Sequence, residues 1–401
     1  MFINFWYPAG TSADVGEAPV RRRMLGQDFV LFRDSGGTVH CLADTCIHRG
    51  ASLGLGKVKG DCIQCPYHGW QFAGDGTCRK IPSLGSQARI PARARVDAYP
   101  TVEKYGLIFA FLGDIPEAER CPILPIPEYG PDGPLPGWTA TIQQFAWNID
   151  YKRSMENGID AAHNEYVHDT HGFSGERADY KINPDEWRWL DDEWSTGFFN
   201  KIMAPPLPDK KMREASGRET NTVIEAGTGH HGVSMLWTFI YPTPAIKIHQ
   251  YLFEAPIDAA HTSLYLVNLR NFLTEPEHDA RIMGRNEYVA LQDRDVLHDV
   301  RPVLTPEKNS GEFFTPADRS IAIYREKLKR WENRGWRIDI DAVARDHRRV
   351  AYAIPCPARR ETKGWVLDPI PLRPADAGAT AGAAAGAAVA ATETRAEHGR
   401  A

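Results

Sequence analysis

Two short segments that each combine a cysteine with a histidine constrain the fold of this chain more than any other feature. The first is Cys46-Ile47-His48 and the second is Cys65-Pro66-Tyr67-His68, and sixteen residues separate His48 from Cys65. Thiolate and imidazole groups are metal ligands, so each segment offers a pair of ligands to one centre. The separation is long enough for a loop and a strand. The sequence therefore predicts two ligand loops that meet at one metal site.

Two kinds of metal centre fit these four ligands. Two thiolates and two imidazoles can hold one zinc ion, and Cys62 forms an additional Cys-x-x-Cys pair with Cys65. The same ligands can hold a [2Fe–2S] cluster, with the thiolates on one iron and the imidazoles on the other. Zinc fingers usually separate their cysteine pair from their histidine pair, whereas here the two residue types are interleaved. This interleaving favours the cluster.

A second set of candidate ligands lies further along the chain, at His163 and His168. An open-sided Fe(II) site needs two imidazoles and one carboxylate on the same side of the metal. The stretch 148–168 is expected to be helical, and residues five apart on a regular helix point about 140° away from each other. The helix therefore has to end or distort between the two histidines if both bind one ion. Taken alone, the pair also fits the exposed face of an amphipathic helix.

Apolar patterning divides the chain into four regions. The first holds short β-like runs separated by glycine-containing turns, which predicts a small antiparallel domain. A proline-rich connector follows, and then a region of strand-like segments and long amphipathic helices, which is typical of an α+β domain. The last region is rich in alanine and glycine and has almost no large apolar side chains, so we expect it to be disordered. The expected regions are 1–115, 116–137, 138–373 and 374–401.

Charge and cysteine content argue against several classes of function. With 47 Lys+Arg against 52 Asp+Glu the net charge is −5, which does not suit a dedicated nucleic-acid-binding protein. Seven cysteines are too few for a disulfide framework, so we expect a reducing compartment. The first residues do not resemble a signal peptide, and the apolar run at 107–112 is far shorter than the ~20 residues of a membrane-spanning helix. We expect a soluble cytoplasmic protein that contacts neither nucleic acid nor membrane.

The residues that flank the first ligand set carry a family resemblance. Cys46 to Gly50 together with Cys65 to Trp70 resembles the cluster-binding loops of Rieske iron–sulfur domains. Tyr67 stands where the Rieske proteins of respiratory complexes look to carry a disulfide cysteine, and this difference points to the oxygenase branch.

The second ligand set strengthens the same resemblance. The pattern Asn157-x-x-Asp160-x-x-His163-x-x-x-x-His168 resembles the mononuclear iron motif of Rieske non-heme iron oxygenases. The whole chain up to about Pro374 is thus similar to the terminal oxygenase (α) subunit of that family. The resemblance implies an α+β fold, with an N-terminal all-β Rieske [2Fe–2S] domain in 1–115. It also implies a C-terminal helix-grip (START-like) antiparallel-sheet domain around the mononuclear iron in 138–373.

The resemblance also implies a set of site residues. Cys46, His48, Cys65 and His68 would hold the cluster, and His163, His168 and Asp293 would hold mononuclear Fe(II). The segment Gln292 to Val296 resembles the family pattern acidic–Asp–x–x–Val, with Asp293 at the ligand position and a neutral Gln292 where the pattern is acidic. Asp295 is the alternative third ligand.

Two further residues of the iron motif have implied or possible roles. Asp160 is similar to the family carboxylate that links a cluster histidine of one subunit, here His68, to an iron ligand of the next, here His163. A carboxylate that accepts N–H bonds from two imidazoles fixes both tautomers. This link implies a homo-oligomer, most simply a homotrimer. Asn157 lies in the same motif and either sits near the iron or packs against neighbouring residues.

Several other residues resemble ligands, but we expect them to be structural. His171 and Asp169 follow the iron motif and are expected to lie in an exposed loop. His230 and His231 are adjacent, and neighbouring residues on a strand point to opposite faces. The remaining cysteines are expected to be small buried apolar residues: Cys41, Cys62, Cys78, Cys121 and Cys356.

The expected function is that of a terminal oxygenase. The resemblance implies that electrons pass from NAD(P)H through a separate ferredoxin and/or flavin reductase. With O₂, the enzyme would hydroxylate, dihydroxylate or oxidatively demethylate an aromatic or other hydrophobic small molecule. The alternatives are a non-catalytic Rieske electron-transfer or ligand-binding protein and a zinc-bound regulatory module. Iron content separates the first alternative from the oxygenase, and visible absorbance separates the second.

Overall fold

The computed structural model describes residues 1–171, 175–178, 180–206, 210–216 and 220–376. Its N-terminal part contains three small antiparallel sheets with the strand orders β1-β11-β10, β2-β3-β4-β9 and β5-β6-β7-β8. The bounds of these strands are β1 Phe5–Thr11, β2 Val20–Met24, β3 Gln27–Arg33, β4 Val39–Ala43, β5 Lys57–Lys59, β6 Cys62–Gln64, β7 Gln71–Ala73, β8 Cys78–Lys80, β9 Ala98–Tyr99, β10 Thr101–Lys104 and β11 Leu107–Leu112.

Local sequence explains most of this domain. The apolar run of β11 is buried along its whole length, because β11 is the central strand of its sheet. Gly37 and Gly76 lie in tight turns with φ angles of 87° and 79°, which residues with a side chain rarely adopt. The connector that follows carries one short hairpin, with β12 at Tyr129–Gly130 and β13 at Gly133–Pro134.

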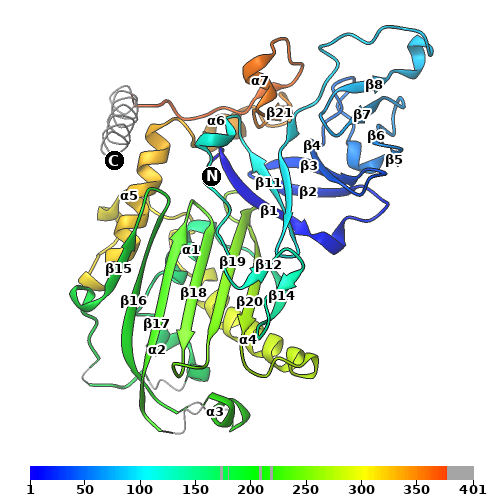
Figure 1. Cartoon of the computed structure of the whole chain (residues 1–401). Coiled ribbons are helices and arrows are strands. Elements are labelled where there is room, and N and C mark those ends of the chain that lie inside the picture. The colour runs from blue at the N-terminus through cyan, green and yellow to red at the C-terminus, as the bar shows by residue number, and fades with distance from the viewer. Residues whose placement is uncertain (172–174, 179, 207–209, 217–219, 377–401) are drawn as a thin grey trace, which may run out of the picture.

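The C-terminal part is built on one seven-stranded antiparallel sheet with the order β14-β20-β19-β18-β17-β16-β15 (Figure 1). The strands are β14 Thr139–Trp147, β15 Arg188–Asp191, β16 Ser195–Ala204, β17 Thr222–His231, β18 Met235–Tyr241, β19 Ile248–Pro256 and β20 Thr262–Arg270. Helices α1, α4 and α5 contact this sheet. The helices and the remaining strands are α1 Tyr151–Gly158, α2 Asn164–Val167, α3 Lys210–Ser216, α4 Asp279–His298, α5 Arg319–Asn333, α6 Ile340–Arg345, β21 Tyr352–Ala353, α7 Ala358–Glu361 and β22 Asp368–Pro369.

The two faces of the large sheet have different partners. On β19, Tyr251 and Phe253 point to one face and pack with Leu107 and Phe109 of the N-terminal domain. Leu252 and its neighbours at alternate positions point to the other face, where they line a cavity of about 970 Å³. One face therefore joins the domains, and the other forms a binding chamber with the helices.

The end of the described chain returns to the N-terminal domain. The guanidinium of Arg359 donates two hydrogen bonds to the buried carboxylate of Asp97, at 2.5 and 2.8 Å, and the hydroxyl of Tyr99 donates to the carbonyl of Ile354. The sequence pattern groups these C-terminal residues with the catalytic region. In the structure they pack on the N-terminal domain.

The expected disordered tail, 374–401, lies outside the described residues from 377 onward. Among the residues that the structure describes, no helix is both long and apolar enough to cross a membrane.

Candidate metal centres

The two loops of the first ligand set have the same backbone turn. In the first loop the amide of Gly50 donates to the carbonyl of Cys46 at 2.8 Å, and in the second the amide of Gly69 donates to that of Cys65 at 3.1 Å. Both glycines follow their cysteine by four residues and have φ angles of 73° and 71°. A side chain would strain this conformation, so glycine at these positions allows both loops to turn alike.

The loops place cysteine and histidine side chains at different depths. Cys46 and Cys65 are each 1% exposed, whereas His48 and His68 are exposed. The Nδ1 atoms of the two histidines face each other at 3.1 Å, and the ring of Trp70 stacks on His48 with an interplanar angle of 9°. The site therefore has a buried side made of thiols and a solvent-facing side made of imidazoles.

The chemistry of this donor set fits a metal cluster. Burial raises the pKa of the Cys46 thiol to about 12, and the neighbouring Cys65 contributes to the rise. Two adjacent buried thiols lose their protons readily only to a positively charged centre. Of the remaining cysteines, Cys62 is half-buried on β6, and the other four are buried: Cys41, Cys78, Cys121 and Cys356.

The second ligand set lies where the helical stretch breaks. Helix α1 ends at Gly158, and the one-turn helix α2 starts after His163 and ends before His168. This break meets the geometric condition that the five-residue spacing imposes. The two imidazole rings lie 5.2 Å apart, on the same side of the chain as Asp293 of α4.

The three side chains converge on a common point. Oδ1 of Asp293 lies 3.2 Å from Nε2 of His168 and 3.7 Å from Nε2 of His163, and all three ligand atoms lie within 4.8 Å of one another. This oxygen is buried and has no hydrogen-bond partner among the described residues. A buried carboxylate oxygen without a donor is costly unless a cation occupies the position it faces. The arrangement is the two-histidine, one-carboxylate set that open-sided Fe(II) sites use.

Hydrogen bonds on the far side of each ring orient the two histidines. Nδ1 of His163 lies 3.0 Å from the backbone carbonyl of Asp160, and Nδ1 of His168 lies 3.1 Å from Oε1 of Gln292. Both acceptors require a proton on Nδ1, which leaves the lone pair of each Nε2 directed at Asp293.

The electrostatics of the site favour a positive charge. Burial alone would lower the pKa of His163, but its hydrogen bond to Asp160 and the charges of Asp293 and Asp160 outweigh burial and raise that pKa. Burial acts in the opposite direction on Asp160, whose pKa is nevertheless lowered by His163. Surroundings that stabilise imidazolium also stabilise a metal cation at the same position.

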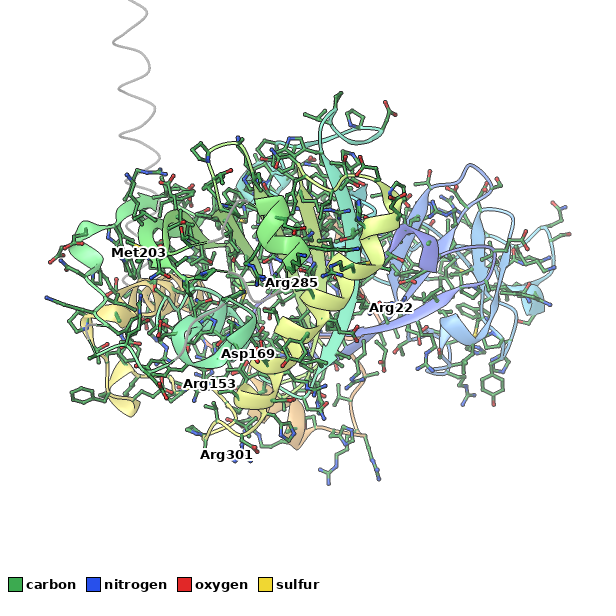
Figure 2. The ribbon with its side chains drawn as sticks, turned by 90° about the horizontal axis from the view of Figure 1, so that it is seen from below. Arg22, Arg153, Asp169, Met203, Arg285 and Arg301 are labelled. Carbon is green, nitrogen blue, oxygen red and sulfur yellow. The ribbon has the colours of Figure 1, made fainter. Side chains whose placement is uncertain are left out.

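Gln292 has a role that the sequence pattern does not reveal. Besides accepting from His168, its side-chain amide donates to Oδ1 of Asp169 at 2.7 Å. Figure 2 shows Asp169 beside α4, the helix that carries Gln292. Asp295 is exposed and pairs with Arg294 instead of joining the histidines. The only signal in the sequence is the position of Gln292 next to Asp293.

The other candidate residues fall into two groups. Asn157, Asp160 and His171 line the same cavity as the three converging side chains, and the ring of His171 lies 4.8 Å from that of His168. His230 and His231 are buried at the end of β17, away from this cavity lining. Their rings bond to Gly232, Ser195 and Pro122.

The cavity that holds the second set is lined by apolar side chains and by nearly as many polar or charged ones, among them Lys181, Arg188, Lys201 and Glu225. Its wall is formed by the inner face of the sheet, α1, α2 and α4. The apolar lining includes Phe145, Trp147, Trp187, Phe198, Ile202, Ile224, Leu236, Ile240, Leu252, Leu264, Leu266, Phe272 and Val289. Such a chamber suits a small molecule with substantial apolar surface.

Comparisons with known proteins match both domains. Residues 5–100 match the family model of the Rieske [2Fe-2S] domain, and residues 147–334 match that of the vanillate O-demethylase oxygenase C-terminal domain. The phenoxybenzoate dioxygenase subunit alpha of Ectopseudomonas oleovorans is 45% identical over 122 residues, which make up 30% of this chain and 29% of that protein. The 4beta-methylsterol monooxygenase of Methylococcus capsulatus is 36% identical over 168 residues, 41% of this chain and 44% of that protein. The chain thus spans less than half the length of these curated relatives.

Solved structures show the same fold. The structure of Pseudomonas putida CBB5 NdmA with caffeine matches this chain with a TM-score of 0.68 at 22% sequence identity. The match covers 82% of this chain and 91% of the NdmA chain. The structure of dicamba monooxygenase bound to dicamba matches with a TM-score of 0.64 at 22% sequence identity. This match covers 85% of this chain and 98% of the dicamba monooxygenase chain. The expected architecture, an all-β domain followed by an antiparallel-sheet α+β domain, is confirmed.

Proposed function

Because the chain belongs to the Rieske non-heme iron oxygenase family, we propose that it is a terminal oxygenase that inserts oxygen from O₂ into an aromatic or other hydrophobic small molecule. One observation carries this proposal. His163, His168 and the unpartnered oxygen of Asp293 converge on the wall of a large cavity whose lining includes many apolar side chains. A protein that only transfers electrons needs neither the ligand set nor the chamber.

The residues of the two centres have separate roles in this proposal. Cys46, His48, Cys65 and His68 would hold a [2Fe–2S] cluster, and His163, His168 and Asp293 would hold mononuclear Fe(II). The cluster would supply one-electron transfer and the Fe(II) would supply dioxygen activation. Asp160 and Gln292 fix the protonated nitrogens of the two histidines.

The cavity wall performs the part of the reaction that belongs to the chain. Its apolar side chains exclude bulk water and hold the substrate beside the ligand set, and Asn157 and Asp160 supply polar groups there. Insertion of one hydroxyl group consumes one O₂, two electrons and two protons and releases one water. Hydroxylation of a methyl group on oxygen or nitrogen leads to demethylation, and insertion of both oxygen atoms leads to a dihydroxylated ring.

Electron delivery is proposed to cross between subunits of a homotrimer. In Figure 1 the sheet β5-β6-β7-β8, whose strands β6 and β7 flank the second cluster loop, lies apart from α2, which disfavours transfer within one chain. Tyr67 beside His68 and Tyr166 on α2 are both 66% exposed. A cyclic head-to-tail assembly would bury both and place His68 of one chain next to Asp160 of its neighbour. A ferredoxin and/or flavin reductase would supply the electrons, and the cytoplasm remains the expected location.

The test of the proposed function combines metal analysis with isotope labelling. The purified protein should contain about three irons per chain and show the visible spectrum of a Rieske cluster. With a generic reductase, NAD(P)H and ¹⁸O₂, a panel of aromatic, methoxylated and steroidal compounds should yield a product that carries ¹⁸O. Asp293→Ala should keep the cluster and lose both the third iron and the product. Two irons per chain and no labelled product would leave an electron carrier as the function.

A separate test addresses the route between subunits. Asp160→Asn keeps the size of the side chain but weakens its bond to imidazole, so both centres should fill and the oligomer should persist. Oxidation of the reduced cluster in a single turnover should nevertheless become very slow. A wild-type rate in this variant, or full activity in a monomeric preparation, would rule out the inter-subunit route.

A further inference from the structure

Glu254 is a buried acidic residue on the cavity-facing side of β19. Residues Ile248, Gln250 and Leu252 alternate along this strand and line the cavity. Glu254 is the next residue in that alternation, so its side chain points to the same face. It is fully buried, at 0% exposure, and no described lysine or arginine forms an ion pair with it. Helix α1 covers this end of the sheet.

A serine on α1 lies between this glutamate and the cavity. Oγ of Ser154 is 2.7 Å from Oε1 of Glu254, and Ser154 lines the cavity together with Asn157, one turn further along α1. The other carboxyl oxygen, Oε2, is buried and has no hydrogen-bond partner among the described residues. Ser154 is thus the single hydrogen-bonding connection from Glu254 to the cavity within the described part of the chain.

The surroundings favour the neutral form of this carboxyl group. Burial raises the pKa of Glu254 well above its ordinary value, the hydrogen bond from Ser154 opposes the rise, and the Asp150 carboxylate adds to it. Tyr151 is also nearby and is itself fully buried, with a raised pKa. A neutral glutamic acid carries a proton that a glutamine or leucine at the same position could not supply.

We propose that Glu254 stores a proton for the iron cavity and delivers it through the hydroxyl group of Ser154. The inference rests on the proposed oxygenase function, because only reduction of O₂ creates the demand for two protons in this cavity. The transfer starts from the arrangement in which the acid proton is on Oε1 of Glu254 and is donated to Oγ of Ser154, whose own hydrogen then points to the cavity. In the transfer, the O–H bond of Glu254 breaks and its proton binds Oγ of Ser154. Ser154 at the same time releases its own proton to the oxygen that is being reduced in the cavity.

After the transfer, Glu254 is a carboxylate that accepts the hydrogen bond of Ser154, and the 2.7 Å contact suits both states. The reverse path restores the proton when product leaves and water enters. A purely structural link between α1 and the sheet would not need an ionisable group. Burying a carboxyl group that can ionise costs more free energy than burying an amide that makes the same hydrogen bond. Glu254→Gln therefore separates the two roles, because it keeps the shape and the hydrogen bond but cannot release a proton.

The first measurement is spectroscopic and does not depend on turnover. Infrared spectra of the oxidised holoenzyme at pH 7 should contain the C=O stretch of a neutral carboxyl group. The band should shift in D₂O, change in frequency in Ser154→Ala and vanish in Glu254→Gln. Absence of a band that Glu254→Gln removes would overturn the proposal, since Glu254 would then hold no proton.

The second measurement follows reoxidation of the reduced holoenzyme by O₂ in H₂O and D₂O. We expect Glu254→Gln and Ser154→Ala to slow this step on the order of 100-fold, within the usual range of general acid–base catalysis. The wild-type rate should fall in D₂O. The matched control is Thr196→Val, because the Thr196 hydroxyl is also buried and also donates to a carboxylate, that of Asp191 at 2.7 Å, but lies outside the cavity lining.

The outcomes separate this inference from the proposed function. If Asp293→Ala is reoxidised as fast as wild type, O₂ is not reduced at the second ligand set and the proposed function fails. If reoxidation depends on Asp293 but Glu254→Gln keeps the wild-type rate and isotope effect, the proton store is wrong and the oxygenase assignment stands. Melting temperatures close to wild type in both variants would show that slow reoxidation is not caused by misfolding.

Discussion

Hydrogen bonds from residues behind the ligands fix the geometry of the second site. Gln292 illustrates this, because one side-chain amide accepts from His168 and donates to Asp169. An acidic residue at this position would accept from His168 but would not donate to Asp169 in its ionised form. The neutral residue therefore satisfies two neighbours at once.

We expect Gln292→Leu to weaken binding of the mononuclear iron about 10- to 100-fold, the usual effect of removing a group that orients a ligand. The cluster spectrum should not change. Equilibrium dialysis against Fe(II), followed by metal analysis, measures the effect. Gln292→Glu is the control, because it keeps the acceptor for His168. Equal iron affinity in wild type and Gln292→Leu would show that His168 needs no such support.

In the first ligand set, we expect His48→Ala and Cys65→Ala each to abolish the [2Fe–2S] spectrum. Each substitution removes one of the four ligands that the cluster needs. Electron paramagnetic resonance of the reduced protein measures the loss. Cys62→Ala is the control, since this half-buried residue lies on β6 outside the loops. A Rieske-type signal that persists in both variants would disprove the ligand assignment.

At the scale of elements, a buried ion network holds α1 against α5. The guanidinium of Arg325 donates two hydrogen bonds of 2.7 Å to Glu156 and contacts Glu312, which also pairs with Arg153. Helix α1 leads directly into the iron motif, so this network sets the position of His163 through the backbone.

Arg325→Met should lower the free energy of unfolding by about 3–5 kcal/mol, because it leaves the buried Glu156 without its partner. Urea unfolding measures the loss. Arg319→Ala on the same helix serves as the control, since its ion pair with Asp185 is exposed and should contribute less than about 1 kcal/mol. Similar losses in the two variants would contradict the special role of the buried pair.

The connector is held to the sheet by Glu128, whose carboxylate contacts His249 at 2.7 Å and the hydroxyl of Tyr251 at 2.9 Å. Burial alone would raise the pKa of Glu128, but these contacts outweigh burial and lower it. The stabilisation is therefore fully present above the unfolded-state pKa of about 4.3 and is lost as the pH falls through the lower folded-state pKa.

We accordingly expect Glu128→Gln to reduce the free energy of unfolding by about 1 kcal/mol at pH 7. Below the folded-state pKa the difference between variant and wild type should shrink, because the wild-type carboxyl is then neutral as well. Denaturant titrations at a series of pH values measure the difference. A difference that does not change with pH would show that the ionised carboxylate contributes nothing.

At the scale of the whole molecule, the C-terminal residues join the two domains. Asp97 is 0% exposed, and Arg359 is its ion-pair partner. Trp365 packs over the guanidinium groups of Arg359 and Arg95. The last described residues thus cover the N-terminal domain, although the chain reaches them through the catalytic region.

Arg359→Met should destabilise the protein by about 3–5 kcal/mol, because Asp97 would remain buried without a counter-charge. Thermal unfolding followed through the cluster absorbance should show earlier loss of the N-terminal domain. The adjacent Arg360→Ala is the control, since the Arg360 side chain is half exposed and its pair with Asp114 is worth less than about 1 kcal/mol. If both variants unfold at the wild-type temperature, the C-terminal segment does not hold the domain.

Short-range patterns in the sequence predict regular elements well. Helix α4 at Asp279–His298 lies in the region where the sequence predicts long amphipathic helices, and strands β1 to β11 lie where it predicts a small antiparallel domain. Strands β16 and β17 lack such a signal because their glycines interrupt the apolar alternation. A Cβ atom on Gly197 would lie 2.4 Å from the ring of Trp237, so glycine there makes room for a side chain from β18. Only packing reveals that requirement.

The sequence by itself determined the chemistry of the ligands, because thiolates and imidazoles at short, fixed spacings identify a kind of metal centre without knowledge of the fold. It also determined the two-domain architecture, which follows from the motifs and their order. The family pattern pointed to Asp293, and the tertiary structure brings this carboxylate to the histidines, whereas Asp295 takes another direction from α4. The tertiary structure alone decided the partners of Gln292 and the burial of Glu254. These depend on contacts between segments far apart in the chain, which local pattern does not encode.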